Sequence, residues 1–185
     1  MISKSELRAE ARALRKRLAQ ADPLAAGRVA DHAAALPSGE PVALYVAVGS
    51  ELDPAPLARA LLAAGRSLCL PVTIERDAPL IFRRWSPGEP LEMDLAGCPA
   101  PLPLSATVDP GLILCPLLAF DAWGGRLGQG GGYYDRTFAA RPNVTRIGLA
   151  YAGQAVERLP VQRHDMALDG VLTEAGYRPH DGISH

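Results

Sequence analysis

Residues 42–72 read VALYVAVGSELDPAPLARALLAAGRSLCLPV, and this stretch decides the fold. Residues 42–48 are continuously apolar and rich in β-branched side chains, which is typical of a buried strand. Asp53-Pro54 predicts the start of a helix that ends near Gly65, because proline suits the first helical turn and glycine the position after the last one. Residues 67–72 predict a second buried strand. Since strand–helix–strand units almost always form right-handed parallel crossovers, we expect an α/β protein.

Further strands are predicted on the C-terminal side of this unit. Residues 111–115 predict a third buried strand, residues 145–151 a fourth and residues 171–174 a short fifth. Residues 80–85 predict another strand, for which an edge position is one option. Residues 86–110 are rich in proline and glycine and predict mainly irregular structure.

Three more helices are predicted outside residues 42–72. Ser3-Lys4-Ser5-Glu6 matches a capping box and predicts a helix to about Ala19. Asp22-Pro23 predicts the start of a second helix toward Leu36, and residues 133–141 predict a third. No internal repeat or domain boundary is visible. We therefore expect residues 1–185 to form a single three-layer α/β domain with a mostly parallel central sheet flanked by helices.

Composition limits the classes of function. The formal net charge of −1 and the aromatic content of 5% argue against a general nucleic-acid binder, which needs a positive field or stacking platforms. The chain has three cysteines, Cys69, Cys98 and Cys115. This odd number, and the spacing of the three residues, match neither a zinc site nor a disulfide framework. The longest apolar stretch, residues 112–120, is interrupted by Pro116 and is far shorter than a membrane span, and no secretory signal is visible. We expect a cytoplasmic protein that is a monomer or a weak homo-oligomer and has no nucleic-acid or membrane partner.

The strongest functional signal is the stretch GGRLGQGGGYYDR at residues 124–136. Six glycines allow successive backbone N–H groups to turn toward an anion, and Arg126 and Arg136 supply donors suited to phosphate. Asp135 could hold the metal that accompanies a triphosphate. The alternative is a flexible linker, but a linker needs neither the arginines nor the paired tyrosines and the aspartate. The segment is neither a Walker A loop, because it lacks Gly-Lys-Ser/Thr, nor a Rossmann dinucleotide-binding fingerprint.

The same stretch resembles a known family. LCPLLAFD at residues 114–121, followed by Gly125-Arg126-Leu127-Gly128 and by GYYDR at residues 132–136, is similar to the signature of the 5-formyltetrahydrofolate cyclo-ligases, or methenyltetrahydrofolate synthetases. Three other stretches resemble this family in the expected order. They are the basic N-terminal helix at residues 1–20 with Lys4 and Arg8, residues 45–71 with Glu51, and residues 162–165 followed by Asp169 and Thr173-Glu174.

The resemblance implies specific site residues. It implies ATP binding by Lys4, Arg8, Arg126, Leu127, Gly128, Gln129, Gly130, Gly131, Gly132, Tyr133 and Tyr134. It implies folate binding by Val46, Glu51, Gln129, Gly130, Gly131, Gly132 and Tyr133. It also implies catalytic roles for Arg126 and Tyr134, and Mg²⁺ binding by Asp135 and Asp165.

Each of these assignments has a plainer alternative. Lys4 and Arg8 share one helix face with Arg12, so they could reach one polyanion or form a solvated basic surface to which Arg15 and Lys16 also belong. Glu51 follows a buried strand and could accept N–H bonds from a pterin, or lie on a surface loop. Val46 could be core, and the paired tyrosines could stack on a ligand or pack the loop. His164 and Asp165 could be ordinary loop residues.

The implied reaction converts 5-formyltetrahydrofolate and ATP into 5,10-methenyltetrahydrofolate, ADP and phosphate, through phosphorylation of the formyl oxygen and attack by N10. This reaction needs positioning and charge neutralisation rather than a protein nucleophile. Two rivals are a related enzyme acting on another N-formyl substrate and a non-catalytic nucleotide- or folate-binding module. Two departures from the family pattern are Ala100, in Gly97-Cys98-Pro99-Ala100-Pro101 where a glutamate is frequent, and Gln129, where a basic residue is frequent.

Overall fold

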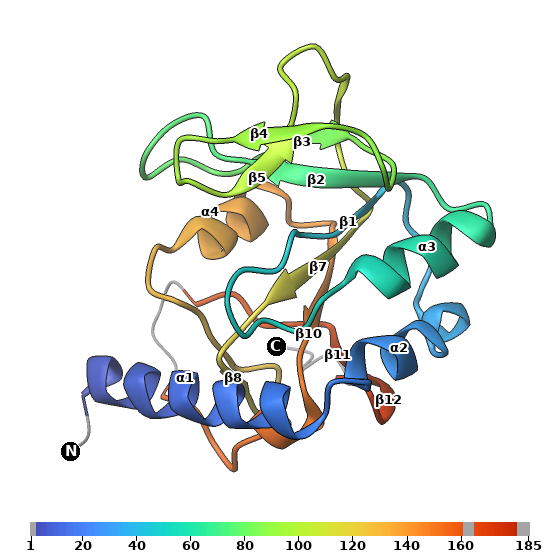
Figure 1. Cartoon of the computed structure of the whole chain (residues 1–185). Helices are drawn as coiled ribbons and strands as arrows, with labels where there is room; N and C mark the ends of the chain where they lie inside the picture. The colour runs from blue at the N-terminus through green and yellow to red at the C-terminus, as the bar shows by residue number, and fades with distance from the viewer. Residues whose placement is uncertain (1–2, 161–164, 181–185) are drawn as a thin grey trace.

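The centre of the molecule is an eight-stranded sheet of order β12-β11-β10-β7-β1-β2-β3-β6 (Figure 1). The computed structural model describes residues 3–160 and 165–180. Along the chain the strands of this sheet are β1 (Val42–Ala43), β2 (Leu68–Val72), β3 (Ile81–Arg84), β6 (Thr107–Val108), β7 (Leu112–Pro116), β10 (Thr145–Leu149), β11 (Gly170–Thr173) and β12 (Gly176–Pro179). The five strands from β11 to β2 pair in parallel, and β12, β3 and β6 join antiparallel. The predicted α/β class with a mostly parallel sheet is confirmed.

Helices cover both faces of this sheet. On one face, α2 (Ala25–Ala30) and α3 (Ala55–Ala63) contribute Val29 and Leu57 to a core with Leu44, Leu114 and other strand residues. On the other face, α4 (Tyr133–Ala140) buries Phe138 against alternate residues of the same strands. Successive side chains of a strand point to opposite faces of the sheet. Because both faces are covered here, these strands carry apolar residues at consecutive positions in the sequence.

The longest helix, α1 (Lys4–Ala21), lies along the bottom of Figure 1. Its predicted capping box is present: the Ser3 hydroxyl accepts from the Glu6 N–H, and the Glu6 carboxylate accepts from the Ser3 N–H. Ala11 packs on a small core with Leu118 and Leu127, next to the hairpin of β8 (Ala119–Phe120) and β9 (Arg126–Leu127). None of the helices in the described part of the chain is long and apolar enough to cross a membrane.

The prediction for the second helix was wrong at its start and at its end. Asp22 is instead the C-cap of α1, where its N–H donates to the Leu18 carbonyl, and its carboxylate pairs with Arg28. The helix begins only at Ala25 and ends at Ala30, and a separate 3₁₀ turn, η1 (Ala33–Ala35), follows. An Asp-Pro pair between two helices can begin the second helix or end the first, and here the aspartate ends the first.

The prediction of one strand over residues 42–48 was also wrong. Only Val42 and Ala43 form the strand β1, Leu44 packs in the core, and Tyr45, Val46 and Val48 line a cavity. Residues 86–110 are mainly irregular, as predicted, but they also contain β6 and a hairpin of β4 (Leu91–Met93) and β5 (Pro99–Pro101), which the sequence did not indicate. Since β6 pairs with β3, residues 80–85 do not form an edge strand.

Candidate active site

A cavity of about 900 Å³ opens at the carboxyl ends of β1, β2 and β7. Val46 follows β1, Thr73 follows β2 and Pro116 ends β7, and all three line this cavity. Open α/β sheets place their ligands at this end of parallel strands. A pocket of this volume is large enough for a drug-sized or cofactor-sized ligand.

The glycine-rich stretch forms one wall of this cavity. Residues 126–136 all line it, from β9 through the glycines into the first turn of α4. Gly132 is the N-cap of α4 and has a left-handed backbone, with φ of 69°. The Gly131 carbonyl accepts a 2.8 Å hydrogen bond from the Arg136 guanidinium, which also lies over the Tyr133 ring. The glycines therefore belong to a folded loop closed by contacts of its own, and the linker alternative is wrong.

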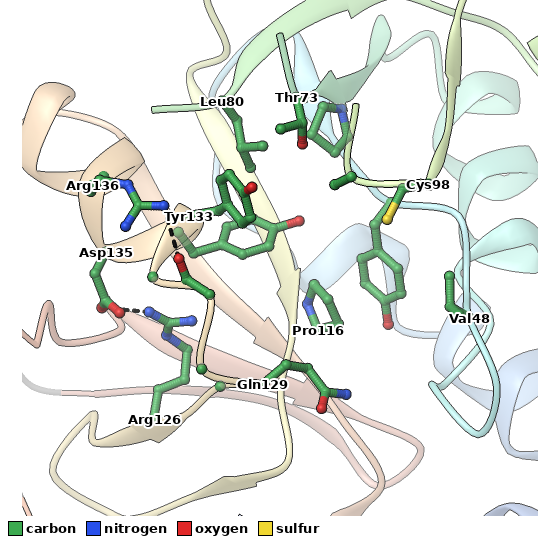
Figure 2. A pocket seen from close by; sticks show the side chains of 18 of the residues that line it. Val48, Thr73, Leu80, Cys98, Pro116, Arg126, Gln129, Tyr133, Asp135 and Arg136 are labelled. Carbon is green, nitrogen blue, oxygen red and sulfur yellow. Dashed lines mark hydrogen bonds and ion pairs between the residues drawn. The ribbon is translucent and has the colours of Figure 1, made fainter. Parts of the chain in front are cut away.

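Arg126 is held beneath this loop. Its guanidinium pairs with Asp135 at 2.6 Å, as the dashed line in Figure 2 shows, and lies 5.9 Å from the Tyr134 ring centroid and 5.5 Å from that of Phe138. The Arg126 side chain is only 5% exposed, and its Nε is buried without a hydrogen-bond partner among the described residues. Asp135 also accepts a 3.3 Å bond from the Met166 N–H. Arg126 thus holds a fixed, desolvated charge, which strengthens its interaction with any anion in the cavity.

Helix α1 supplies further cations along the same wall. Lys4 and Arg8 line the cavity, and Arg8 Nε donates to the Gly128 carbonyl at 3.1 Å. Lys4 Nζ lies 3.4 Å from the Asp165 carboxylate, which lines the cavity too. Arg12 donates to the Gln129 side chain at 2.9 Å. The basic face of α1 is therefore docked on the glycine-rich loop, and the fully solvated alternative is wrong for Lys4 and Arg8.

Glu51 lies in a tight turn after β1 and also lines the cavity. Its carboxylate accepts from the Val48 N–H at 3.0 Å and lies 3.7 Å from Arg15 Nη1. The side chain is 10% exposed, so the surface-loop alternative is wrong. Burial raises the pKa of Glu51, while the Val48 N–H and the Arg15 charge oppose that rise. Val46, which is half-buried, both packs on the core and lines the cavity.

Two cavity-lining tyrosines keep their protons over a wide pH range. Burial raises the pKa of both Tyr45 and Tyr134 well above the ordinary value, with the nearby Glu51 charge contributing in each case. The Tyr45 hydroxyl donates to the Leu52 carbonyl at 2.6 Å and so fixes the turn that holds Glu51. A neutral phenol can donate a hydrogen bond to an anion but is a poor general base at neutral pH.

The two predicted metal-binding carboxylates lie at one cavity. Asp135 and Asp165 both line it, although each already contacts a cation, Arg126 and Lys4 respectively. The described residues contain no group of three or more histidine, cysteine or acidic side chains placed to bind a metal ion. Mg²⁺ bound with a nucleotide needs only one or two carboxylates, because phosphate oxygens and waters complete its shell. The donor set therefore fits nucleotide-bound Mg²⁺ and not a closed metal site. His164 lies outside the described residues.

Sequence reasoning missed the wall opposite the glycine-rich loop. Thr73 and Cys98 lie there, across the cavity from Arg126 and Asp135 in Figure 2. Asp94, which also lines the cavity, organises this wall through bonds from the Thr73, Ala96 and Cys98 N–H groups. Asp94 and Gly97, which has a φ of 76°, have the spacing of a turn, and this sequence signal could have indicated the turn. Cys98 and Pro99 line the cavity, so the segment that departs from the family pattern lies at the site.

Comparisons with known proteins agree on one family. The profile of the 5-formyltetrahydrofolate cyclo-ligase family matches residues 1–174. The chain is 37% identical to the 5-formyltetrahydrofolate cyclo-ligase of Escherichia coli strain K12, over 71% of this chain and 76% of that protein. It is 36% identical to the enzyme of that name from Mycolicibacterium smegmatis, over 74% of each chain.

Two solved structures share the fold. The 5,10-methenyltetrahydrofolate synthetase of Aquifex aeolicus superimposes with a TM-score of 0.81 at 32% identity, covering 100% of this chain and 96% of that one. The corresponding protein of Mycoplasma pneumoniae has a TM-score of 0.69 at 22% identity, covering 94% of this chain and 99% of that one. The second likeness concerns the fold alone.

Proposed function

The chain belongs to the 5-formyltetrahydrofolate cyclo-ligase family, and from this premise we propose that it converts 5-formyltetrahydrofolate to 5,10-methenyltetrahydrofolate with ATP and Mg²⁺. One observation carries the proposal beyond the family name. A single cavity is lined on one side by the glycine-rich loop with Lys4 and Arg8, and elsewhere by the buried carboxylate of Glu51. A triphosphate and a pterin need these two kinds of surface, and the reaction needs them side by side.

The proposed reaction has two steps. The formyl oxygen attacks the γ-phosphorus of ATP, and the bond to the β-phosphate oxygen breaks to release ADP. N10 then attacks the formyl carbon and loses its proton, while the carbon–oxygen bond breaks and phosphate leaves with its electron pair. The product is the methenyl cation. Holding N10 near the formyl carbon makes ring closure intramolecular, which can supply several kcal/mol.

The protein's part in this scheme is to position the substrates and neutralise charge. Lys4, Arg8 and Arg126 are assigned to the phosphates, because their cationic groups lie at the wall formed by the loop. Tyr134 is assigned as a neutral hydrogen-bond donor, in keeping with its raised pKa. Asp135 and Asp165 would hold Mg²⁺ together with the nucleotide. Bound there, the ion would neutralise charge that develops on the phosphate oxygens during transfer.

Glu51→Gln is expected to weaken binding of 5-formyltetrahydrofolate about tenfold or more while ATP affinity stays nearly unchanged. Charge-assisted hydrogen bonds contribute about 1.5–3 kcal/mol, and the amide offers one acceptor where the carboxylate offers two. The loss should be smaller than for Glu51→Ala, since glutamine can still accept from the Val48 N–H. Isothermal titration calorimetry with each ligand separately measures both effects.

Asp53→Asn, in the neighbouring turn, is the matched control and should bind folate normally. Normal folate affinity in Glu51→Gln would show that the assignment of Glu51 is wrong.

Gly132→Ala is expected to raise the KM for ATP and to lower the free energy of unfolding by about 1–2 kcal/mol, because an L-residue is strained in the left-handed region. Its Cβ would also lie 2.7 Å from Arg136 Nη1. Gly65→Ala is the matched control, because Gly65 has φ of 81° with nothing within 4 Å of a Cβ and lies outside the cavity. It should lose similar stability in urea unfolding while its KM for ATP stays normal. Equal KM values in the two variants would mean that the loop conformation does not serve ATP.

We also propose a cytoplasmic location, a monomer or weak homo-oligomer, and no nucleic-acid or membrane partner. Support for a reducing compartment comes from the free cysteines, of which Cys69 and Cys115 are buried. ATP-dependent formation of the methenyl chromophore from 5-formyltetrahydrofolate tests the proposed activity. A related enzyme with another N-formyl substrate, or a module that only binds, would form none.

A further inference from the structure

We propose that Arg15 is a positioning residue for folate binding, which acts by holding the Glu51 carboxylate in its ionised form and in place. This inference rests on the proposed function, in which Glu51 binds the pterin. In the sequence, Arg15 belongs to a basic helix face that could be solvated. The structure instead buries Arg15, with 5% of the residue exposed, and turns it away from the glycine-rich loop toward the turn that carries Glu51.

Three contacts fix the Arg15 guanidinium between separate segments. Its Nε donates to the Ser50 hydroxyl at 3.2 Å, and its Nη1 donates to the Leu117 carbonyl at 3.3 Å, just beyond β7. The same Nη1 lies 3.7 Å from Glu51 Oε1. Arg15 itself does not line the cavity, whereas Glu51 does. Arg15 therefore acts on a ligand only through Glu51.

The Arg15–Glu51 pair matters because both side chains are largely removed from water. Burial alone disfavours an ionised carboxylate, and a nearby positive charge restores it. The other ionisable groups that face Glu51 are Tyr45, Tyr134 and Cys98, and burial raises the pKa of each. These groups are therefore uncharged near neutral pH. Among the described residues, Arg15 is the cation that pairs with Glu51. Burial raises the pKa of Glu51, and the Val48 N–H and the Arg15 charge each oppose that rise.

Helix α1 thus contacts both the glycine-rich loop and the turn that carries Glu51 through one row of basic residues. Lys4 and Arg8 lie at the wall that we assign to ATP, and Arg15, two turns after Arg8, holds the turn that we assign to folate. Lysine could not reproduce the Arg15 contacts in full, because a guanidinium donates from several nitrogens in a fixed plane while an ammonium is a point charge.

The test compares the pH dependence of folate binding in the wild type, Arg15→Met and Arg15→Lys by calorimetry. Removing the cation raises the pKa of Glu51, so the ionised form appears only at higher pH. Arg15→Met should bind 5-formyltetrahydrofolate about tenfold or more weakly at pH 6 and approach the wild type near pH 9, since a neighbouring charge shifts a carboxyl pKa by about 1–3 units. Arg15→Lys should lie between the two. ATP affinity should change less than about threefold in both variants.

Three controls separate positioning from general damage. Arg17→Met, an exposed cation on the same helix, should behave as the wild type at every pH. In a Glu51→Gln background, Arg15→Met should add no further pH dependence, because no carboxylate remains to titrate. Thermal melts at each pH identify folded samples, and Arg15→Lys provides the comparison if Arg15→Met does not fold.

Two results would overturn the inference. The first is a pH profile of folate binding in the folded Arg15 variants that matches the wild type. The second is an equal loss of ATP and folate affinity at all pH values, which would show that Arg15 only packs the structure. If the wild type binds folate but forms no methenyl product, the proposed reaction fails while the role of Arg15 in binding is still measured. If the wild type binds no folate at all, the proposed function and this inference both fail.

Discussion

Asp135→Asn is expected to lower kcat at least about a hundredfold and to raise the Mg²⁺ concentration needed for half-maximal activity. A metal ion that bridges phosphates stabilises transition-state charge by several kcal/mol, and the amide is a much weaker ligand than the carboxylate. Asp165→Asn should act in the same direction. Because groups acting on one centre are not additive, the double variant should lose less than the product of the two single losses. Initial rates over a Mg²⁺ titration at saturating ATP measure each effect.

The control for this prediction is a second aspartate–arginine ion pair, which lies outside the cavity. Asp109 pairs with Arg141 at 2.7 Å, and neither residue lines the cavity. Asp109→Asn should therefore leave the Mg²⁺ requirement unchanged, which separates loss of an ion pair from loss of a metal ligand. Fully additive losses in the Asp135 and Asp165 variants would remove Asp165 from the proposed metal site. An unchanged Mg²⁺ requirement in Asp135→Asn would remove Asp135.

Arg126→Ala is expected to raise the KM for ATP at least about tenfold while the KM for 5-formyltetrahydrofolate changes less. A charge-assisted bond to phosphate contributes about 1.5–3 kcal/mol, and the low exposure of this guanidinium limits screening by water. Steady-state kinetics with each substrate varied in turn measures both KM values.

Arg141→Ala is the matched control, because Arg141 is also paired with an aspartate and also lies over an aromatic ring, that of Phe82. It should lose stability without a change in either KM. If Arg126→Ala raises both KM values equally, the loop is a structural element and does not bind phosphate. Arg126→Lys keeps the charge without the planar fork and should lie between the wild type and Arg126→Ala.

Much of the sheet could be predicted from the sequence because its strands are buried on both faces. Residues 67–72, 111–115 and 171–174 lie in short apolar runs and correspond to β2, β7 and β11. The run 42–48 has the same composition, but only its first two residues pair in the sheet. Val46 and Val48 line the cavity instead. Apolar side chains in a ligand pocket cannot be told from core side chains by composition, because the same residue types occupy both places.

The glycine-rich loop of the candidate site could be predicted from the sequence, whereas the placement of Arg15 and of the wall around Asp94 could not. The glycine-rich stretch is local in sequence, so its composition and its family resemblance could single it out, and it lines the cavity. Arg15 could not be placed, since its burial depends on Ser50 and Leu117, which are distant in the chain. The wall around Asp94 was missed for a similar reason, because the β4–β5 hairpin depends on pairing between residues in a segment rich in proline and glycine.

The most direct test of the central claim measures two products in one reaction. The purified protein is mixed with 5-formyltetrahydrofolate, ATP and Mg²⁺, and methenyl absorbance and ADP release are followed together. We predict that one methenyltetrahydrofolate forms per ADP released, that neither product forms when one substrate is omitted, and that Glu51→Ala lowers both rates equally at a fixed folate concentration below its KM. Release of ADP without the methenyl product, or formation of that product without ATP, would contradict the account.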